Sequence, residues 1–190
     1  GFKEKVIITK GVGVFNYHDQ TPFVERKEVK NFLYVGRLVE VKNLKYLVQK
    51  FNKHPELNLH IIGFGELEEE LKAMSNANIV FHGPVDNVKL SAYYQTLDVF
   101  ILPSIAEPWG LVVEEALNNG MPVMVSDRVG CHDDLVCSET GVVFSLHEDD
   151  FETRLKEICN LHNYNQMRKH ISTLNFEAVE KQQVDCYIDY

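Results

Sequence analysis

Residues 98–120 read DVFILPSIAEPWGLVVEEALNNG and contain one complete unit of the fold. The apolar run at 98–103 predicts a buried strand, and the pattern from Gly110 to Asn119 predicts a helix. Gly120 follows as the glycine expected after a helix C-terminus. Glu107 lies in the loop between the two elements. A buried strand that leads into a helix through a short loop is typical of α/β domains.

The same alternation continues on both sides of this unit. The buried strands are continuous apolar runs, which favour a parallel sheet covered by helices on both faces. The sequence therefore predicts an α/β fold of three layers, with a doubly wound parallel sheet of about six strands and helices at the C-terminal end. Further strands are expected at 31–36, 59–63, 78–83, 122–126 and 140–144, and a strand or hinge segment at 5–9; helices are expected from Asn43 to about 53, at 66–74, from Asp86 and beyond Asp149.

Composition and charge limit the classes of function. The chain has 190 residues with 28 acidic and 19 basic side chains, for a net charge of −9. This balance argues against nucleic acid as a partner, because phosphate backbones bind to clustered basic surfaces. No apolar run reaches the ~20 residues of a membrane span, and no secretory leader is recognisable. The chain starts at Gly1 rather than Met, so we expect a piece of a longer protein.

Cysteine and histidine spacing gives no sign of a metal centre. The cysteines form no C-x-x-C pair, which indicates reduced thiols in a cytoplasmic protein. His132, Asp133 and Asp134 are adjacent and cannot all point at one ion from regular structure, so we expect loop or capping roles for them. The sequence therefore predicts no metal site. The cysteines are Cys131, Cys137, Cys159 and Cys186.

The start of the helix after Glu107 has the features of an anion site. The amide groups of Gly110, Leu111 and Val112 open the helix, where backbone N–H groups lack partners and the helix dipole is positive. Gly110 has no side chain, so a ligand can approach the backbone there. In a doubly wound sheet, ligands bind at the carboxyl ends of the strands. A phosphate is the predicted ligand.

Two carboxylates, Glu107 and Glu115, flank this helix start. Glu115 shares a helix face with Leu111, so it can point to the same crevice. Carboxylates are poor phosphate ligands but accept charge-assisted hydrogen bonds from the hydroxyl groups of a sugar or ribose. An equally weighted alternative is that Glu114 and Glu115 are ordinary first-turn acids that the helix dipole favours.

Two further strand ends carry candidate binding residues. Gly36, Arg37 and Lys42 follow the strand at 31–36, and the two cations can converge on a diphosphate. The alternative is that they are ordinary surface cations. Gly63 and Gly65 follow the next strand as a lone G-x-G, which by itself is a weak signal because glycine turns are common.

Together these segments resemble the retaining glycosyltransferases of the group 1 type, which have the GT-B fold. The Glu107-x7-Glu115 pair within EPWGLVVEEA is the specific motif. The others are weaker individually, and their order and spacing match from about residue 5 to residue 150. They are VGRL at 35–38 with Lys42-Asn43, IGFG at 62–65, FHGPV at 81–85, GCHDDLV at 130–136 and TGVVF at 140–144.

The resemblance implies two Rossmann-like domains, of which this chain is similar to the C-terminal, donor-binding one. Residues 1–20 would lead from an absent N-terminal domain, 21–172 would form the donor domain, and 173–190 would be a crossover helix. The segment Gly11-Val12-Gly13-Val14 departs from the usual Asn-Gly-Val-Asp of the hinge. The N-terminal domain would supply most of the acceptor site.

The resemblance also implies residue roles. Glu107 would contact the transferred sugar and is the expected catalytic residue. Arg37, Lys42 and the backbone of 110–112 would bind the pyrophosphate, and Glu115 would hold the ribose. The remaining donor-binding residues would be Gly36, Gly63 and Gly65 at the strand ends, and Val85 beside the base.

The implied reaction is transfer of a hexose-type sugar from a UDP, GDP or ADP donor, with retention and without metal or cofactor. The acceptor would be a cell-surface polysaccharide, lipopolysaccharide or lipid-linked saccharide, at the cytoplasmic face of the membrane. This fragment is expected to bind the donor but not to catalyse transfer alone.

Three alternatives belong to other classes. A non-catalytic interaction module and a nucleotide-sugar epimerase would share the architecture. A nicotinamide-dependent oxidoreductase fits poorly, because Gly36 is followed by Arg37-Leu38 and no G-x-G-x-x-G is present after the first strand.

Overall fold

The computed structural model describes residues 23–175 and residue 178. The segment expected at 5–9, the hinge motif at 11–14 and the crossover helix lie outside the described residues. Their domain boundaries therefore stay predictions.

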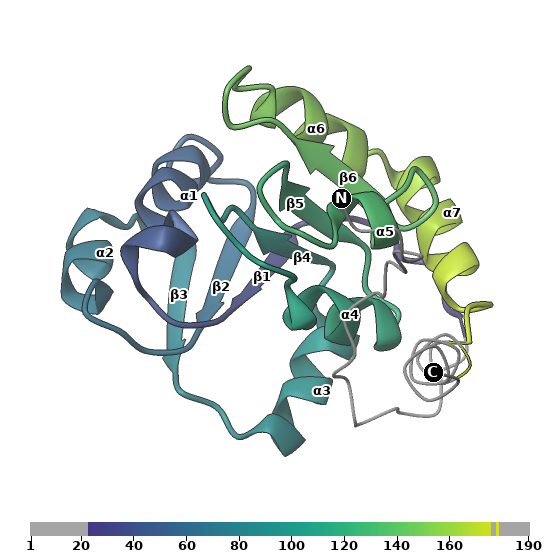
Figure 1. Ribbon diagram of the computed structural model, residues 1–190, viewed down its shortest axis with the longest axis horizontal. Helices are drawn as coiled ribbons and strands as arrows, with labels where there is room; N and C mark the ends of the chain where they lie inside the picture. The colour runs from purple at the N-terminus through teal and green to yellow at the C-terminus, as the bar shows by residue number, and fades with distance from the viewer. Residues whose placement is uncertain (1–22, 176–177, 179–190) are drawn as a thin grey trace, which may run out of the picture.

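The centre of the fold is a six-stranded sheet in which every pairing is parallel, as the sequence predicted. The strand order is β3-β2-β1-β4-β5-β6. The chain winds outward from β1 to β3, returns to the centre, and winds outward again from β4 to β6 (Figure 1). The strands are β1 (Asn31–Val35), β2 (Asn58–Ile62), β3 (Ile79–Gly83), β4 (Val99–Leu102), β5 (Val123–Ser126) and β6 (Gly141–Phe144).

Helices cover both faces of this sheet, which gives the three layers (Figure 1). Helices α1 (Leu44–Phe51), α2 (Glu68–Met74) and α6 (Phe151–Ile158) lie on one face, and α3 (Asn87–Thr96) and α4 (Leu111–Asn118) on the other. Aromatic contacts fix this arrangement: Tyr46 of α1 stacks on Phe144 of β6, and Tyr94 of α3 packs against Phe100 of β4. The remaining elements are the short 3-10 helix η1 (Glu40–Lys42), α5 (His132–Leu135) and α7 (Leu161–Ile171).

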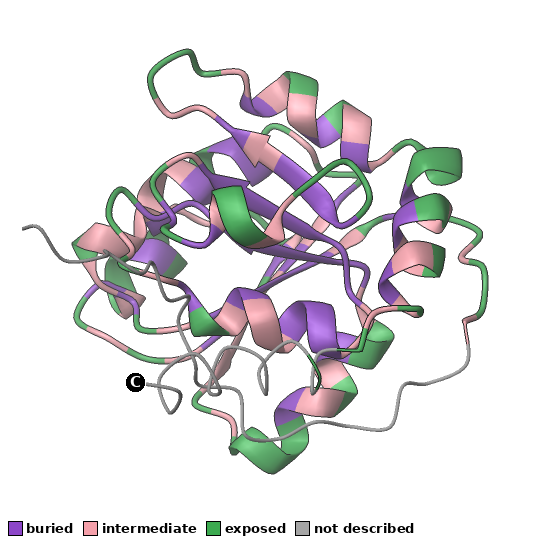
Figure 2. Cartoon of the chain, turned by 45° about the vertical axis from the view of Figure 1, so that its right-hand side comes forward, coloured by how far each residue is buried: buried purple, intermediate pink, exposed green. Residues whose placement is uncertain are grey.

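The core lies along the central strands. Every residue of β4 and β5 is buried, and β1 is buried except at its first residue, so these strands appear purple in Figure 2. Burial on both faces explains why they are continuous apolar runs in the sequence.

The helix starts differ from the sequence prediction in one respect. Asn43 was predicted to cap α1, but its side chain makes no capping hydrogen bond. It adopts a left-handed conformation with φ 57°, because its N–H closes the turn of η1 on the carbonyl of Glu40. Asp86 precedes α3 without a capping bond as well. Gly120, with φ 79°, follows α4 as expected.

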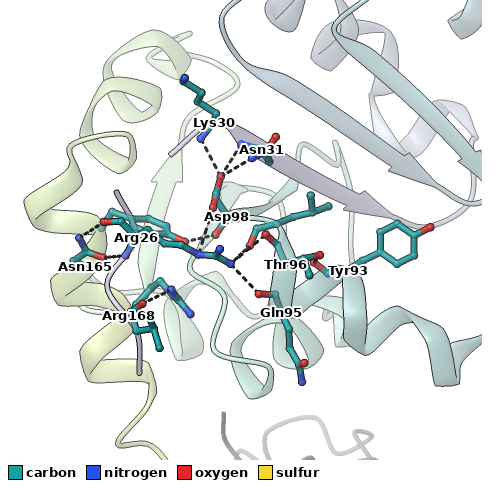
Figure 3. A network of polar contacts seen from close by, with 12 residues as sticks. Arg26, Lys30, Asn31, Tyr93, Gln95, Thr96, Asp98, Asn165 and Arg168 are labelled. Carbon is teal, nitrogen blue, oxygen red and sulfur yellow. Dashed lines mark hydrogen bonds and ion pairs between the residues drawn. The ribbon is translucent and has the colours of Figure 1, made fainter. Parts of the chain in front are cut away.

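A buried carboxylate organises the end of the sheet at which the strands begin (Figure 3). Asp98 is 4% exposed and accepts hydrogen bonds from the amides of Lys30 and Asn31 at 3.0 and 2.9 Å. Arg26 approaches the same carboxylate and donates to the last carbonyls of α3. Tyr164 of α7 donates to the Asp98 carbonyl. These contacts join the segment before β1 to α3 and α7, and so they set the frame of the sheet.

Candidate functional site

The order of the strands reverses between β1 and β4, because the chain leaves β1 toward β2 and leaves β4 toward β5. In doubly wound sheets ligands bind at such a point, so the topology predicts a binding crevice at the carboxyl ends of these two strands. One hydrogen bond, from the Ile105 amide to the Val41 carbonyl at 2.9 Å, ties the two loops together. These loops carry Arg37, Lys42 and Glu107, three of the residues that the sequence singled out.

The loop after β1 is held against the loop after β2 by backbone contacts. The amides of Gly36 and Leu38 donate to Ile62 and Phe64 at 3.0 and 2.9 Å. A Cβ atom at Gly63 would overlap the Gly36 carbonyl, and one at Gly65 would overlap the Leu38 carbonyl. The structure therefore uses both glycines to pack the loop that carries Arg37. Their contact with a donor stays a prediction.

Arg37 projects from this loop and is exposed. Its carbonyl accepts a hydrogen bond from the buried Tyr34 hydroxyl at 2.9 Å. Burial, and then the negative charge of Glu107, raise the pKa of Tyr34, so the phenol stays protonated and remains a donor. Among the described residues, the Arg37 guanidinium has no ion-pair partner. Tyr34 is a positioning residue that sequence reasoning missed; a tyrosine two residues before Gly36 was the available signal.

Glu107 is fixed by a backbone ladder to the segment 128–131. Its amide donates to the Arg128 carbonyl at 3.1 Å, and its carbonyl accepts from the Gly130 amide at 2.8 Å. A Cβ atom at Gly130 would overlap the Pro108 carbonyl, so a glycine is required there. The sequence alone gave no sign of this role for Gly130.

The Glu107 carboxylate forms an ion pair with the Lys42 ammonium group. The Lys42 side chain is 19% exposed and the Glu107 side chain 15% exposed. The sequence placed Lys42 at a pyrophosphate and Glu107 at a sugar, and the structure brings these two charges into direct contact.

Helix α4 begins at Leu111, one residue after the start that the sequence predicted, and the anion site expected there stays a prediction. Gly110 precedes the helix with φ 104°, a conformation that favours glycine, and its own Cβ position is closed by Val129. Leu111 is exposed and Val112 is half-buried in the first turn. Their amides are among the N–H groups that an α-helix leaves without internal partners.

Glu115 is half-buried on α4 and faces α3, where the Tyr94 hydroxyl donates to its carboxylate at 3.2 Å. Burial raises the pKa of Glu115, and the hydrogen bond from Tyr94 partly offsets this effect. Tyr94 is itself buried and was missed as a site residue, since the sequence assigned it only to a helix face.

Val85 lies apart from the other candidates. It is half-buried in the loop after β3, the edge strand, whereas Glu107 follows β4 at the centre. No contact among the described residues joins Val85 to Lys42 or Glu107.

Residues 132–134, for which the sequence predicted loop or capping roles, lie in a short helix, α5. Asp133 and Asp134 are exposed in its first turn, and His132 contacts the Val129 carbonyl through Nδ1 at 2.8 Å. Within residues 23–175, no group of three His, Cys, Asp or Glu side chains is placed to hold a metal ion. No helix in the same range is long and apolar enough to cross a membrane.

The family model for glycosyl transferases group 1 matches residues 18–173 of this chain. The chain belongs to this family. An O-antigen biosynthesis glycosyltransferase of Escherichia coli, WbnH, is 34% identical over 161 residues, which are 83% of this chain and 45% of that protein. The chain thus spans less than half the length of this glycosyltransferase.

Solved structures show the same fold. The lipopolysaccharide outer core galactosyltransferase WaaB, in its apo form, superposes with a TM-score of 0.75 at 21% identity, over 97% of this chain and 55% of that one. A mutant of TarM from S. aureus, in complex with fondaparinux, alpha-GlcNAc-glycerol and UDP, gives a TM-score of 0.79 at 17% identity, over 99% of this chain and 40% of that one. The GT-B assignment of the fold is confirmed.

Proposed function

We propose that this chain is the nucleotide-sugar-binding part of a group 1 glycosyltransferase, and that the crevice between β1 and β4 binds the donor diphosphate. The observation that carries the proposal is the exposed Arg37 side chain, which has no ion-pair partner among the described residues and follows β1, the neighbour of the strand that leads into α4. An exposed cation and a helix N-terminus are complementary to a phosphate. UDP bound to TarM, a protein of the same fold, supports this ligand class.

The spacing of the strands suits an extended nucleotide. Neighbouring strands lie about 4.8 Å apart, so β4, β1, β2 and β3 place their carboxyl ends along roughly 14 Å. Glu107 stands at one end of this row and Val85 at the other. We assign the sugar to Glu107, the phosphates to Arg37 and Lys42, and the base to the loop at Val85.

Glu115 is assigned to the ribose. The hydrogen bond from Tyr94 occupies Glu115 Oε2, and the other carboxylate oxygen is the proposed acceptor for ribose hydroxyls. Burial and this bond hold the side chain in one orientation.

The proposed chemistry is hexosyl transfer with retention, without a metal ion. The leaving diphosphate gains negative charge as the glycosidic bond breaks, and fixed cations and helix amides would stabilise that charge. WbnH and WaaB are named for O-antigen and lipopolysaccharide synthesis, which favours a cell-surface glycan or a lipid-linked saccharide as the acceptor. We place the reaction in the cytoplasm, at the inner face of the membrane, with the acceptor held by the remainder of the enzyme.

Calorimetric titration of this chain with UDP, GDP and ADP tests the proposal. One nucleotide should bind with a Kd from high micromolar to millimolar, because two charge-assisted contacts supply about 3–6 kcal/mol. Arg37→Ala should weaken that binding by roughly 10–100-fold. Arg154→Ala is the charge-matched control, since Arg154 is engaged with Asp150 and Glu157 on α6.

Equal loss of affinity in both arginine variants would refute the site. Absence of binding by any of the three nucleotides at millimolar concentration would favour a non-catalytic interaction module instead.

A further inference from the structure

The ion pair between Lys42 and Glu107 joins two groups that the proposed function assigns to different parts of one ligand. Both side chains are more than four-fifths covered, so neither charge is fully solvated. Arg37, from the same loop as Lys42, has no such partner among the described residues. The site therefore has one available cation and one that is already neutralised.

Backbone hydrogen bonds hold the two loops that carry Lys42 and Glu107, independently of the ion pair between their side chains. Lys42 belongs to η1, whose turn is closed by amide-to-carbonyl bonds from Lys42 to Val39 and from Asn43 to Glu40. Glu107 is held by its ladder to 128–131. Since neither loop depends on the ion pair, the two side chains can separate while their backbones stay in position.

We propose that a bound donor exchanges this ion pair: its diphosphate takes Lys42, and the hydroxyl groups of its sugar take Glu107. This inference rests on the proposed function and adds a preference between donor and product. A complete donor replaces both lost partners. A nucleoside diphosphate replaces only the lost partner of Lys42. It leaves the largely buried Glu107 carboxylate unpaired beside negatively charged phosphates.

The exchange makes Glu107 a residue that discriminates against the product. A charge buried without a partner is unfavourable, and like charges at short range repel. Once the sugar has been transferred, Glu107 competes with the phosphates for Lys42. Re-formation of the ion pair would then assist release of the nucleoside diphosphate.

The test is the affinity of Glu107→Gln for UDP and for inorganic pyrophosphate, which carries the phosphates without base or sugar. The variant removes the competing charge, so we expect both ligands to bind about 10-fold more tightly than to the wild-type chain. A residue that only positions the sugar would leave both affinities unchanged. Any tightening should vanish in the Lys42→Met background, because there is then no cation to release.

Glu114→Gln is the matched control. Glu114 is half-buried in the first turn of α4. Burial raises the pKa of the Cys131 thiol, and the charges of Glu114 and Glu107 raise it further, so both carboxylates lie near this thiol. Among the described residues, Lys42 forms its ion pair with Glu107 and not with Glu114. We expect less than a 2-fold change in this variant. Unfolding midpoints followed by Trp109 fluorescence check that each variant folds. Glu107→Asp shortens the side chain and keeps its charge, so it should tighten binding less than Glu107→Gln. This variant replaces Glu107→Gln in the test if Glu107→Gln does not fold.

The outcomes separate this inference from the proposed function. Unchanged or weaker binding in Glu107→Gln, with a loss in Arg37→Ala, would overturn the exchange and leave the donor site standing. Equal tightening in Glu107→Gln and Glu114→Gln would reduce the effect to general electrostatics and also overturn it. Tightening of pyrophosphate with no binding of UDP, GDP or ADP would show that an anion competes with Glu107 for Lys42, but it would overturn the donor assignment and with it the exchange by a donor. No binding of any of these ligands would overturn both.

Discussion

Gly63→Ala tests how the loop that carries Arg37 is held in place. The substitution adds a single methyl group at the end of β2. That methyl would overlap the carbonyl of Gly36, a backbone atom that cannot rotate away, and the residue has φ 136°, which L-residues rarely adopt. The loop must move. We therefore expect two backbone hydrogen bonds to weaken or break, from the Gly36 amide to the Ile62 carbonyl and from the Gly63 amide to the Gly83 carbonyl.

The magnitude follows from these two effects. A residue in a sparsely populated backbone region costs about 1–3 kcal/mol. Each lost backbone hydrogen bond costs roughly 0.5–1.5 kcal/mol. The two bonds measure 3.0 and 2.9 Å, so both are intact in the structure. We therefore expect the free energy of unfolding to fall by about 2–6 kcal/mol, a large share of the ~5–15 kcal/mol typical of a domain.

Gly120→Ala is the matched control. Gly120 also has a positive φ of 79°, but a Cβ atom there would meet nothing within 4 Å. It carries the backbone penalty alone, about 1–2 kcal/mol. Urea unfolding followed by the fluorescence of Trp109, the single tryptophan, gives both values. A loss in Gly63→Ala no larger than that in Gly120→Ala would refute the close packing of the two loops.

Three further predictions concern other parts of the chain. Asp98→Ala leaves the amides of Lys30 and Asn31 without their acceptor and removes the ion-pair partner of Arg26, so thermal unfolding should show a loss of about 2–6 kcal/mol, at about 1–3 kcal/mol for each unsatisfied amide. Tyr94→Phe removes the hydrogen bond that favours the charged form of Glu115, so the pKa of Glu115 should rise further. The affinity for UDP should then fall about 3–10-fold by calorimetry. Unchanged affinity would show that Glu115 does not contact the nucleotide. Burial lowers the pKa of His60, and the neighbouring His82 lowers it further; burial also lowers the pKa of His82. Because of these lowered pKa values, the folded state binds fewer protons than the unfolded state below about pH 6.5. The free energy of unfolding should therefore fall as the pH drops from 7 to 5, less steeply in His60→Asn than in the wild-type chain, and identical slopes in urea titrations would contradict this assignment.

Much of the fold was predictable because its signals are local. Strands that are buried on both faces must be apolar throughout, so the runs at β1, β4 and β5 identified a parallel sheet without knowledge of their neighbours. Gly120 marked the end of α4 because a left-handed residue after a helix is most easily a glycine.

Local signals were insufficient where two distant segments meet. Asn43 has the composition of a helix cap, yet the turn of η1 determines its conformation. Gly63 looked like an ordinary turn glycine and Gly130 was only one letter of a motif, and only the packed loops show which carbonyl occupies the space at each. Tyr34 and Tyr94 looked like core aromatics, although their hydroxyl groups hold Arg37 and Glu115.

The sequence by itself determined the fold class, the family and the loops that carry the candidate site, because periodicity and motif spacing are properties of contiguous residues. Only the tertiary structure decided which charges meet. Lys42 and Glu107 are separated by 64 intervening residues, and their contact exists because β1 and β4 are neighbours in the sheet. Strand order depends on the packing of the whole chain, and no local pattern encodes it.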